Sequence, residues 1–323
     1  MLEIGIPTYN SRATLGRALA SIAMQTERKR VLVTICDDCS TENYDDIIAL
    51  FQPFLNIRCI KTDENGGAGV ARNEIIKNAC GDFLMFLDAD DALGSPLALK
   101  KLMHEIYRAW PDVTFGRFYE EADGVIIEKD ICNSIWMHGK VWKTSFLQEN
   151  EIYFPPIRYN EDSAFCTLAN ALKQSDLIVD FPIYCWLNNK NSTVRGMDDY
   201  SARSALDFIR GRMYVYNELI SRNERSKAEH DLCHNMVSIY YLYINITRSK
   251  PDIAQQYVHE WGCFLREINF DSLIAQEGVM AYMDNMVNKT PFQPLYGIYT
   301  PHLTFEQFLN LCLEEKSENG KKN

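Results

Sequence analysis

The chain has 323 residues, 46% of them hydrophobic and 24% charged, and its formal net charge is -11. A chain of this length and composition is expected to fold as one large or two modest globular domains. Its acidity argues against nucleic acid or an anionic membrane surface as the main partner.

The amino-terminal segment Met1–Pro7 has neither the basic region nor the long apolar run of a signal peptide, and it predicts a first strand instead. No apolar run approaches the roughly 18 residues that a membrane-spanning helix needs. We therefore expect a cytoplasmic protein without a transmembrane segment, whose ten cysteines are reduced thiols. Cys36 and Cys39 have C-x-x-C spacing, but the two carboxylates between them disfavour the thiolates that redox chemistry needs.

Residues 1–95 alternate between strand and helix patterns. The predicted strands are Leu2–Pro7, Val31–Cys36, Ile57–Lys61 and Phe83–Leu87, and the predicted helices are Arg12–Met24, Tyr44–Phe51 and Gly66–Ala79. This alternation predicts an α/β fold whose central sheet is mostly parallel, with helices on both faces.

Residues 96–195 mix the two patterns, and helical periodicity dominates afterwards. We expect helices at Pro96–Trp110, Val141–Gln148 and Asp162–Leu172, strands at Val113–Phe118, Gly124–Ile127 and Leu177–Leu187, and further helices near 200–222, 226–248, 252–267, 271–288 and 304–315. The polar tail Lys316–Asn323 is expected to be disordered. The chain is therefore divided into a domain at 1–195 and a helical carboxyl-terminal region at 196–323.

The most informative motif is an apolar run, Phe83–Leu87, that leads directly into Asp88, Asp90 and Asp91. A strand this apolar is expected to be buried on both faces, so its end brings the carboxylates to the rim of the sheet. Asp88 and Asp90 are two residues apart, and a turn can aim both at a hard divalent cation that also binds a diphosphate. For this motif alone, a solvated acidic turn is the alternative.

The other predicted strands also end in polar segments. These are Pro7-Thr8-Tyr9-Asn10, Asp37-Asp38-Cys39-Ser40, and Asn65-Gly66-Gly67 followed by Ala71-Arg72-Asn73. The carboxyl ends of parallel strands lie along one edge of a sheet, so these segments are expected to converge on one crevice.

Each polar segment suits a nucleoside diphosphate. Asp38, placed at a strand end outside the core, can accept hydrogen bonds from a base or ribose, and Tyr9 can stack on a base. The glycines of 66–69 allow close approach of the backbone, and Arg72 can reach a phosphate. Taken singly, these residues are equally expected as packing, a capped turn or a surface ion pair.

These four segments, in this order, resemble the amino-terminal half of the family-2 glycosyltransferases, which have the GT-A fold. The resemblance is strong over residues 3–91, extends to about residue 195, and implies a Rossmann-like catalytic domain that uses a nucleotide-sugar donor and inverts the anomeric carbon. It implies Mn²⁺ or Mg²⁺ at Asp88 and Asp90, and a UDP-sugar, with GDP- and dTDP-sugars as alternatives. It assigns donor binding to Pro7, Thr8, Tyr9, Asn10, Asp37, Asp38, Asn65, Gly66, Gly67, Arg72, Asp88 and Ala89.

Downstream, Asn160-Glu161-Asp162 is similar to the family's Glu-Asp pair. The resemblance implies that Asp162 is the general base, with Glu161 the next candidate, whereas ordinary capping of a helix is the alternative. The segment 136–143 resembles the one before the acceptor region, which makes His138 and Lys140 candidate acceptor or phosphate contacts; aromatic packing with a solvated lysine is as well supported. An asparagine stands at 188 and 189, where the family usually has a basic residue, and Arg195 is the candidate substitute.

The sequence therefore predicts a metal-dependent inverting glycosyltransferase, and the alternative is a catalytically silent module of the same fold that binds sugar nucleotides or glycans. A phosphatase of the Asp-x-Asp class is disfavoured because no Asp ends the first strand. The acceptor stays open among glycans, lipid-linked carriers, proteins and modified nucleobases. We expect the helical region to serve acceptor choice or homo-oligomer formation, with Tyr240, Tyr241 and Tyr243 mostly as core or interface residues.

Overall fold

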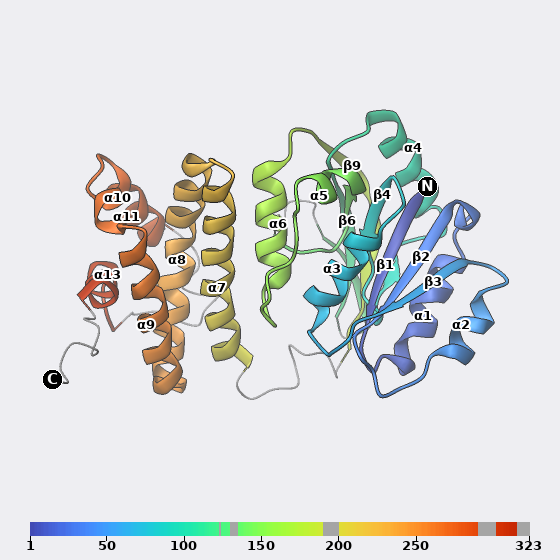
Figure 1. Cartoon of the computed structure of the whole chain (residues 1–323), viewed down its shortest axis with the longest axis horizontal. Coiled ribbons are helices and arrows are strands. Elements are labelled where there is room, and N and C mark those ends of the chain that lie inside the picture. Colours follow the sequence, from blue (N-terminus) through green and yellow to red (C-terminus); the bar gives the residue numbers. More distant parts are fainter. Residues whose placement is uncertain (123, 130–134, 190–199, 290–301, 315–323) are drawn as a thin grey trace. The chain divides into compact units, whose positions relative to one another are not determined.

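The computed structural model describes residues 1–122, 124–129, 135–189, 200–289 and 302–314. The chain divides into two compact units, Met1–Ser192 and Thr193–Asn323 (Figure 1). The first unit contains a mixed sheet with helices, and the described part of the second is helical.

One sheet runs through the first unit in the order β3-β2-β1-β4-β8-β6-β9-β5, and β7 pairs with β6 beside this path. The strands are β1 (Leu2–Thr8), β2 (Val31–Asp37), β3 (Asn56–Lys61), β4 (Phe83–Phe86), β5 (Ala92–Leu93), β6 (Val113–Ala122), β7 (Val125–Lys129), β8 (Lys140–Lys143) and β9 (Asp176–Trp186). Strands β1 to β4 pair in parallel, as predicted. Strand β8 is antiparallel to both β4 and β6, whereas β9 is parallel to β6. The predicted α/β fold is confirmed, with a parallel half that carries the motifs and a mixed half.

Helices cover both faces of the sheet, because side chains alternate between the faces along each strand. They are α1 (Arg12–Ala23), α2 (Asp45–Phe51), α3 (Ala68–Asn78), α4 (Ala98–Ala109), α5 (Thr144–Glu149) and α6 (Glu161–Leu172). Leu19 of α1 and Leu102 of α4 share a buried core with Ile4 of β1. The neighbouring Gly5 faces the other way, where a side chain would collide with Ile75 of α3. Core packing therefore fixes the register of the strands whose ends carry the polar segments.

Two predicted helices are wrong in their extent. Residues 141–148 form the short strand β8 followed by α5, because Val141 and Trp142 are buried between β4 and β6. A short apolar run does not distinguish a buried strand from a buried helix. The predicted helix 271–288 is divided into α10 (Phe270–Ile274) and α11 (Val279–Lys289). Gly278 separates them with a φ of +83°, a conformation that suits glycine.

The second unit packs its tyrosines inside. Its other helices are α7 (Tyr200–Ser221), α8 (Arg225–Ser249), α9 (Pro251–Glu267) and α13 (Phe305–Glu314). Tyr240, Tyr241 and Tyr243 of α8 are all buried, which confirms that they belong to the core. The hydroxyl of Tyr240 donates to the Leu303 carbonyl at 2.6 Å, and that of Tyr241 donates to the Val287 carbonyl at 3.1 Å. Among the described residues, every helix is too short or too polar to cross a membrane.

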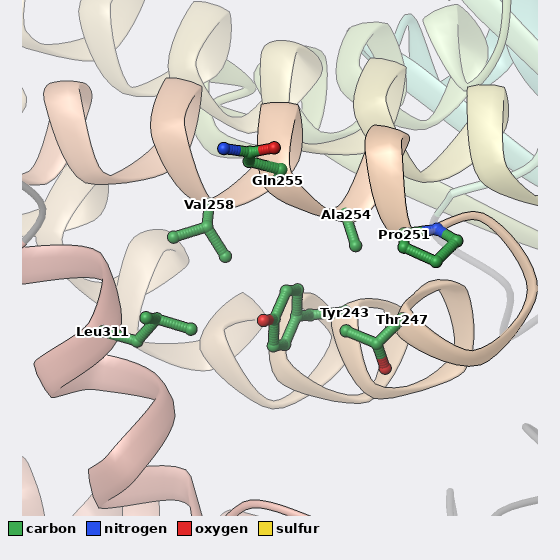
Figure 2. A pocket seen from close by; sticks show the side chains of 7 residues that line it. All are labelled: Tyr243, Thr247, Pro251, Ala254, Gln255, Val258 and Leu311. Carbon is green, nitrogen blue, oxygen red and sulfur yellow. The ribbon is translucent and has the colours of Figure 1, made fainter.

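The second unit contains a pocket of about 300 Å³ between α8, α9 and α13. Figure 2 shows the side chains that line it. The residues that line it are Tyr243, Thr247, Pro251, Ala254, Gln255, Val258 and Leu311. None of these residues belongs to the polar segments that the sequence singles out. The candidate site is therefore sought in the first unit, at the ends of the parallel strands.

Candidate active site

The ends of β1, β2 and β4 are joined by hydrogen bonds at one edge of the sheet. The Asp38 N–H donates to the Thr8 carbonyl at 2.8 Å, and the Leu87 N–H donates to the Gly5 carbonyl at 3.0 Å. The Thr8 hydroxyl donates to the carbonyl of Cys36 at 3.0 Å. The predicted convergence of these three strand ends is confirmed, and Pro7 and Thr8 are buried within it.

The loop after β1 is fastened to the loop after β2. Asn10 has a φ of 47°, and its side-chain oxygen accepts hydrogen bonds from the Thr41 N–H and the Thr41 hydroxyl, both at 3.0 Å. The Asn10 N–H donates to the Ser40 hydroxyl at 3.0 Å. Tyr9 directly precedes Asn10 and is 45% exposed, so its ring is at the surface beside the strand ends. Tyr9 is thus available for stacking, while Asn10 shapes the loop.

Asp38 organises the glycine-containing turn before α3. Its carboxylate accepts hydrogen bonds from the Thr62 hydroxyl at 2.9 Å and the Asn65 amide at 3.1 Å, and from the N–H groups of Gly66 and Gly67 at 3.1 and 2.7 Å. Asp38 is only 2% exposed, so the expectation that it lies outside the core is wrong. It is buried because one carboxylate satisfies four donors of a turn that has no strand partner. The neighbouring Asp37 is half-buried and accepts from the Ser40 N–H at 2.9 Å.

Gly67 occupies the position immediately before α3 with a φ of +88°, which favours glycine. A side chain there would find no atom within 4 Å, so Gly67 borders open space. The N–H groups of Gly66 and Gly67 both donate to Asp38, so neither glycine supplies a hydrogen-bond donor to a ligand. Gly67 leaves room for a ligand, whereas a side chain at Gly66 would collide with Val70.

Arg72 of α3 is buried and joins two carboxylates from distant parts of the chain. One terminal nitrogen donates to Asp88 at 2.7 Å, and the other donates to Glu161 at 2.9 Å. The guanidinium also lies over the ring of Phe154, 5.4 Å from its centre. Burial acts to raise the pKa of Asp88, but the charge and hydrogen bond of Arg72 together with the interaction with His138 outweigh it, so that this pKa is lowered. Asp88 is therefore ionised beside a fixed cation.

The Asp88–Asp91 turn is held by β9. The Asp91 N–H closes the turn by donating to the Asp88 carbonyl at 3.0 Å. The Asp91 carboxyl accepts from the Tyr184 hydroxyl at 2.5 Å and from the Leu187 N–H at 2.8 Å, and it is 1% exposed. Burial, together with the charges of Asp88 and Asp90, raises the pKa of Asp91 to about 8. Asp91 is thus a structural anchor, which the sequence analysis did not assign although it is the third Asp of the motif.

Asp90 and Ala89 occupy the middle of this turn. Asp90 is half-buried and accepts a hydrogen bond from the Asn189 amide at 2.8 Å, whereas Ala89 is buried. Burial and the neighbouring charge of Asp88 raise the pKa of Asp90. Asn189 is one of the two asparagines that stand where the family usually has a basic side chain. It therefore contacts Asp90, one of the two predicted metal ligands.

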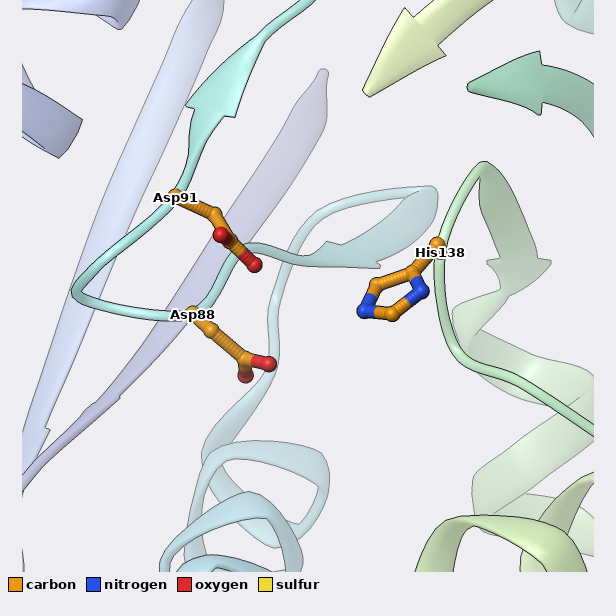
Figure 3. Close-up of side chains that lie close together, drawn as sticks. All are labelled: Asp88, Asp91 and His138. Atoms are coloured by element: carbon orange, nitrogen blue, oxygen red, sulfur yellow. The ribbon is translucent and has the colours of Figure 1, made fainter. Parts of the chain in front are cut away.

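Figure 3 shows His138, from the loop before β8, facing Asp88 and Asp91. One ligand atom from each of these three residues lies within 4.8 Å of the others. Burial lowers the pKa of His138 to about 4, and its Nδ1 has no hydrogen-bond partner among the described residues. Its ring stacks on Trp186, with the ring centres 5.2 Å apart. Carboxylate oxygens and a neutral imidazole are suitable ligands for a divalent cation, so this cluster fits the implied metal. It contains Asp88 of the two predicted ligands but not Asp90, whose role as a ligand stays a prediction.

The Glu161-Asp162 pair begins α6, directly after Asn160, whose φ is 59°. Glu161 is held by Arg72, and burial together with the charge of Asp162 raises its pKa to about 7. Asp162 accepts a hydrogen bond from the Ser163 N–H at 2.7 Å, and burial raises its pKa. The structure therefore brings this pair to the edge that carries Asp88, as the motif order suggested.

Two further candidates differ in their placement. Lys140 is 3% exposed, and its ammonium group donates to the Trp136 carbonyl, so it is packed inside rather than solvated. Burial lowers the pKa of Lys140. Arg195 lies outside the described residues. An acceptor or phosphate role for Lys140 and Arg195 stays a prediction.

Residues 3–154 match the family described as "Glycosyl transferase family 2". These residues form a family 2 glycosyltransferase domain. A poly(ribitol-phosphate) beta-glucosyltransferase of Bacillus spizizenii is 32% identical over an alignment of 203 positions that covers 57% of this chain and 32% of that protein. The poly(ribitol-phosphate) beta-N-acetylglucosaminyltransferase TarS of Staphylococcus aureus is 31% identical over an alignment of 176 positions that covers 50% of this chain and 30% of that protein.

Aligned regions thus span about a third of the length of these curated relatives. Among solved structures, S. aureus TarS 1–349 in complex with UDP-GlcNAc has a TM-score of 0.71 at 19% identity, covering 97% of this chain and 90% of that one. A mannosyltransferase of Pyrobaculum calidifontis in complex with GDP-Man and Mn²⁺ has a TM-score of 0.54 at 14% identity, covering 96% and 85%. The predicted GT-A fold is confirmed, and the family 2 domain carries the polar strand ends described above.

Proposed function

We propose that the chain is an inverting glycosyltransferase that moves a sugar from a UDP-sugar to a hydroxyl of a glycan or polyol-phosphate polymer. The observation that carries this proposal is the shared guanidinium of Arg72, which brings Asp88 and the Glu161-Asp162 pair to one strand-end site. The donor class is supported by the UDP-GlcNAc bound in the TarS structure, and the acceptor class by the poly(ribitol-phosphate) in the names of two relatives.

In this proposal the donor lies along the edge formed by the loops after β1, β2 and β3. Tyr9 would stack on the base, because it is exposed beside the strand ends. Asp38 would support donor binding indirectly, by holding the turn that ends in Gly67. This turn borders open space in which the donor could lie. The diphosphate would then lie near Asp88 and Asp90.

Asp88 and Asp90 would hold Mn²⁺ or Mg²⁺, with His138 as a further candidate ligand. Asp91 is less suited, because its carboxyl is engaged by Tyr184 and Leu187 and its raised pKa favours the protonated form at neutral pH. When bound, such a cation neutralises the negative charge that develops on a departing diphosphate. Asp88 and Asp90 would fix the place at which that cation, and through it the diphosphate, is held.

Asp162 would take the proton of the acceptor hydroxyl. The acceptor oxygen forms a bond to the anomeric carbon while the bond from that carbon to the diphosphate oxygen breaks, so the configuration inverts. A pKa raised by burial makes Asp162 a stronger base than an exposed carboxylate, provided that it is ionised. Glu161 is the less suitable base, because Arg72 already occupies it.

Nucleotide binding with and without metal tests the proposal. UDP should raise the melting temperature more in Mn²⁺ than in EDTA, since a ligand at 100 times its Kd adds about 2.7 kcal/mol of stability. Asp90→Ala should abolish this difference, and Glu149→Ala, at an exposed position of α5 in the same unit, should keep it. Equal UDP binding in EDTA would contradict the metal assignment. Binding of UDP-sugars without transfer or hydrolysis would favour a silent binding module.

A further inference from the structure

Arg72 is placed as an internal link and not as a surface cation. It is 5% exposed, and its Nε has no hydrogen-bond partner among the described residues. Its two terminal nitrogens reach Asp88, 16 positions later in the chain, and Glu161, 89 positions later. A guanidinium engaged on both terminal nitrogens is poorly placed to bind a phosphate as well.

The space around Arg72 is shaped to admit Glu161. A side chain at Gly69, one turn before Arg72 on α3, would lie 3.1 Å from Cγ of Glu161 and 3.3 Å from Cβ of Phe154. Phe154 stacks on Phe165 of α6 with ring centres 3.9 Å apart, and the guanidinium lies over Phe154. Gly69 and the stacked phenylalanines thus let α3 and the start of α6 approach closely enough for the ion pair.

We propose that Arg72 is a positioning residue that couples Asp88, on the donor side of the site, to Glu161, on the acceptor side. The inference rests on the proposed function, because that function assigns the two sides. One cation is shared by two carboxylates, so Glu161 is committed to Arg72 and Asp162 remains as the proton acceptor. The orientation of Asp88 likewise depends on Arg72.

The sharing of the Arg72 guanidinium between two carboxylates has a measurable consequence for metal and nucleotide binding on the donor side. When Glu161 becomes neutral, the charge of Arg72 is balanced by Asp88 alone. Asp88 then offers less negative charge to a divalent cation, although Glu161 itself is not a metal ligand. Neutralising the acceptor-side residue should therefore weaken metal-dependent nucleotide binding, and only while Arg72 bridges the two carboxylates.

Calorimetric Kd values for UDP, measured in Mn²⁺ and in EDTA, test this coupling. Glu161→Gln should weaken binding in Mn²⁺ by about fivefold or more, with a change of about twofold or less in EDTA. In an Arg72→Met background, Glu161→Gln should change the Kd in Mn²⁺ by no more than about twofold. Glu74→Gln is the matched control, because Glu74 lies on α3 and pairs with Lys77 at 2.7 Å. It should leave both Kd values unchanged.

Arg72→Lys provides a second background in case Arg72→Met does not fold, because it keeps the charge and loses the two-pronged geometry. There, too, the effect of Glu161→Gln should fall to about twofold or less. The proposal would be overturned if Glu161→Gln still raised the Kd for UDP in Mn²⁺ by about fivefold in either background. It would also be overturned if Glu161→Gln weakened UDP binding equally in Mn²⁺ and in EDTA.

Urea unfolding separates a failure of this inference from a failure of the proposed function, because it needs no nucleotide. Asp88→Asn and Glu161→Gln should shift the unfolding midpoint non-additively with Arg72 present and additively in the Arg72→Lys background. Additive shifts in both backgrounds would overturn the coupling even if UDP binds. Non-additive shifts in a protein that does not bind UDP would keep the coupling and reject the donor assignment.

Discussion

The strand-end site of the first unit and the helices of the second both bury polar side chains, but in different proportions. At the strand ends, the buried groups are ionisable and have specific partners. Asp38 is held by the turn before α3, Arg72 by Asp88 and Glu161, and Asp91 by Tyr184 and Leu187. Within the helices, buried tyrosines donate to main-chain carbonyls, as Tyr241 does to Val287. The ion pair of Arg212 and Asp231, at 3.7 Å, joins the adjacent helices α7 and α8.

This difference indicates what each region is for. A buried tyrosine contributes apolar area, and one hydrogen bond satisfies its hydroxyl. Buried charges carry a desolvation cost that their pairing does not reliably offset, so they are weak evidence for stability. A concentration of them at loops along one sheet edge is better explained by chemistry at that edge. The buried tyrosines of the second unit are accounted for by packing.

The largest loss of stability is expected at Asp38 and should distinguish it from the adjacent Asp37. Asp38→Ala should lower the free energy of unfolding by about 2–4 kcal/mol, because buried donors of the turn before α3 lose a charged acceptor. Asp37→Ala should cost about 1 kcal/mol or less, because Lys61, with which Asp37 pairs at 3.4 Å, is exposed. Urea denaturation measures both. Equal losses would show that the turn does not depend on Asp38, and UDP affinity should fall with Asp38→Ala as the turn relaxes.

A smaller loss of stability is expected when one buried tyrosine hydroxyl is removed from each region. Tyr184→Phe and Tyr241→Phe should each cost about 1 kcal/mol of stability, because each removes a buried hydrogen bond. Only Tyr184→Phe should also weaken Mn²⁺-dependent UDP binding, because Tyr184 holds the turn that carries Asp88 and Asp90. The paired measurement is calorimetry in Mn²⁺. The comparison between the regions fails if Tyr241→Phe weakens UDP binding as much.

The smallest effect is expected in the pocket of the second unit. Thr247→Val keeps the shape of the side chain and removes a hydroxyl that donates to the Ile244 carbonyl at 2.8 Å within α8. Stability should change by about 0.5 kcal/mol or less. The Kd for UDP should stay the same, whereas any change should appear in turnover with the acceptor. If Thr247→Val weakened UDP binding as much as it lowered turnover, this would contradict the expectation that the helical region serves acceptor choice and not donor binding.

The sequence was sufficient for the parallel half of the sheet and for the convergence of its polar segments, since alternating apolar strands and helices allow few arrangements. It was not sufficient for the partners of those segments. Arg72 and Glu161 are 89 positions apart, and Asp91 and Tyr184 are 93 apart. No local pattern links such pairs, so the phosphate role expected for Arg72 took no account of its buried partners. Strand β8 was missed for the same reason, because its pairing with β4 and β6 decides its conformation.

Asp162→Asn tests the central claim most directly, because it keeps the shape of the side chain and removes its basicity. The account predicts that kcat for sugar transfer falls by about 100-fold or more, the range expected for a lost general base. The donor KM and the Kd for UDP in Mn²⁺ should change little, because the proton is taken in the transition state. Transfer at the wild-type rate by Asp162→Asn would contradict the account and place the base elsewhere.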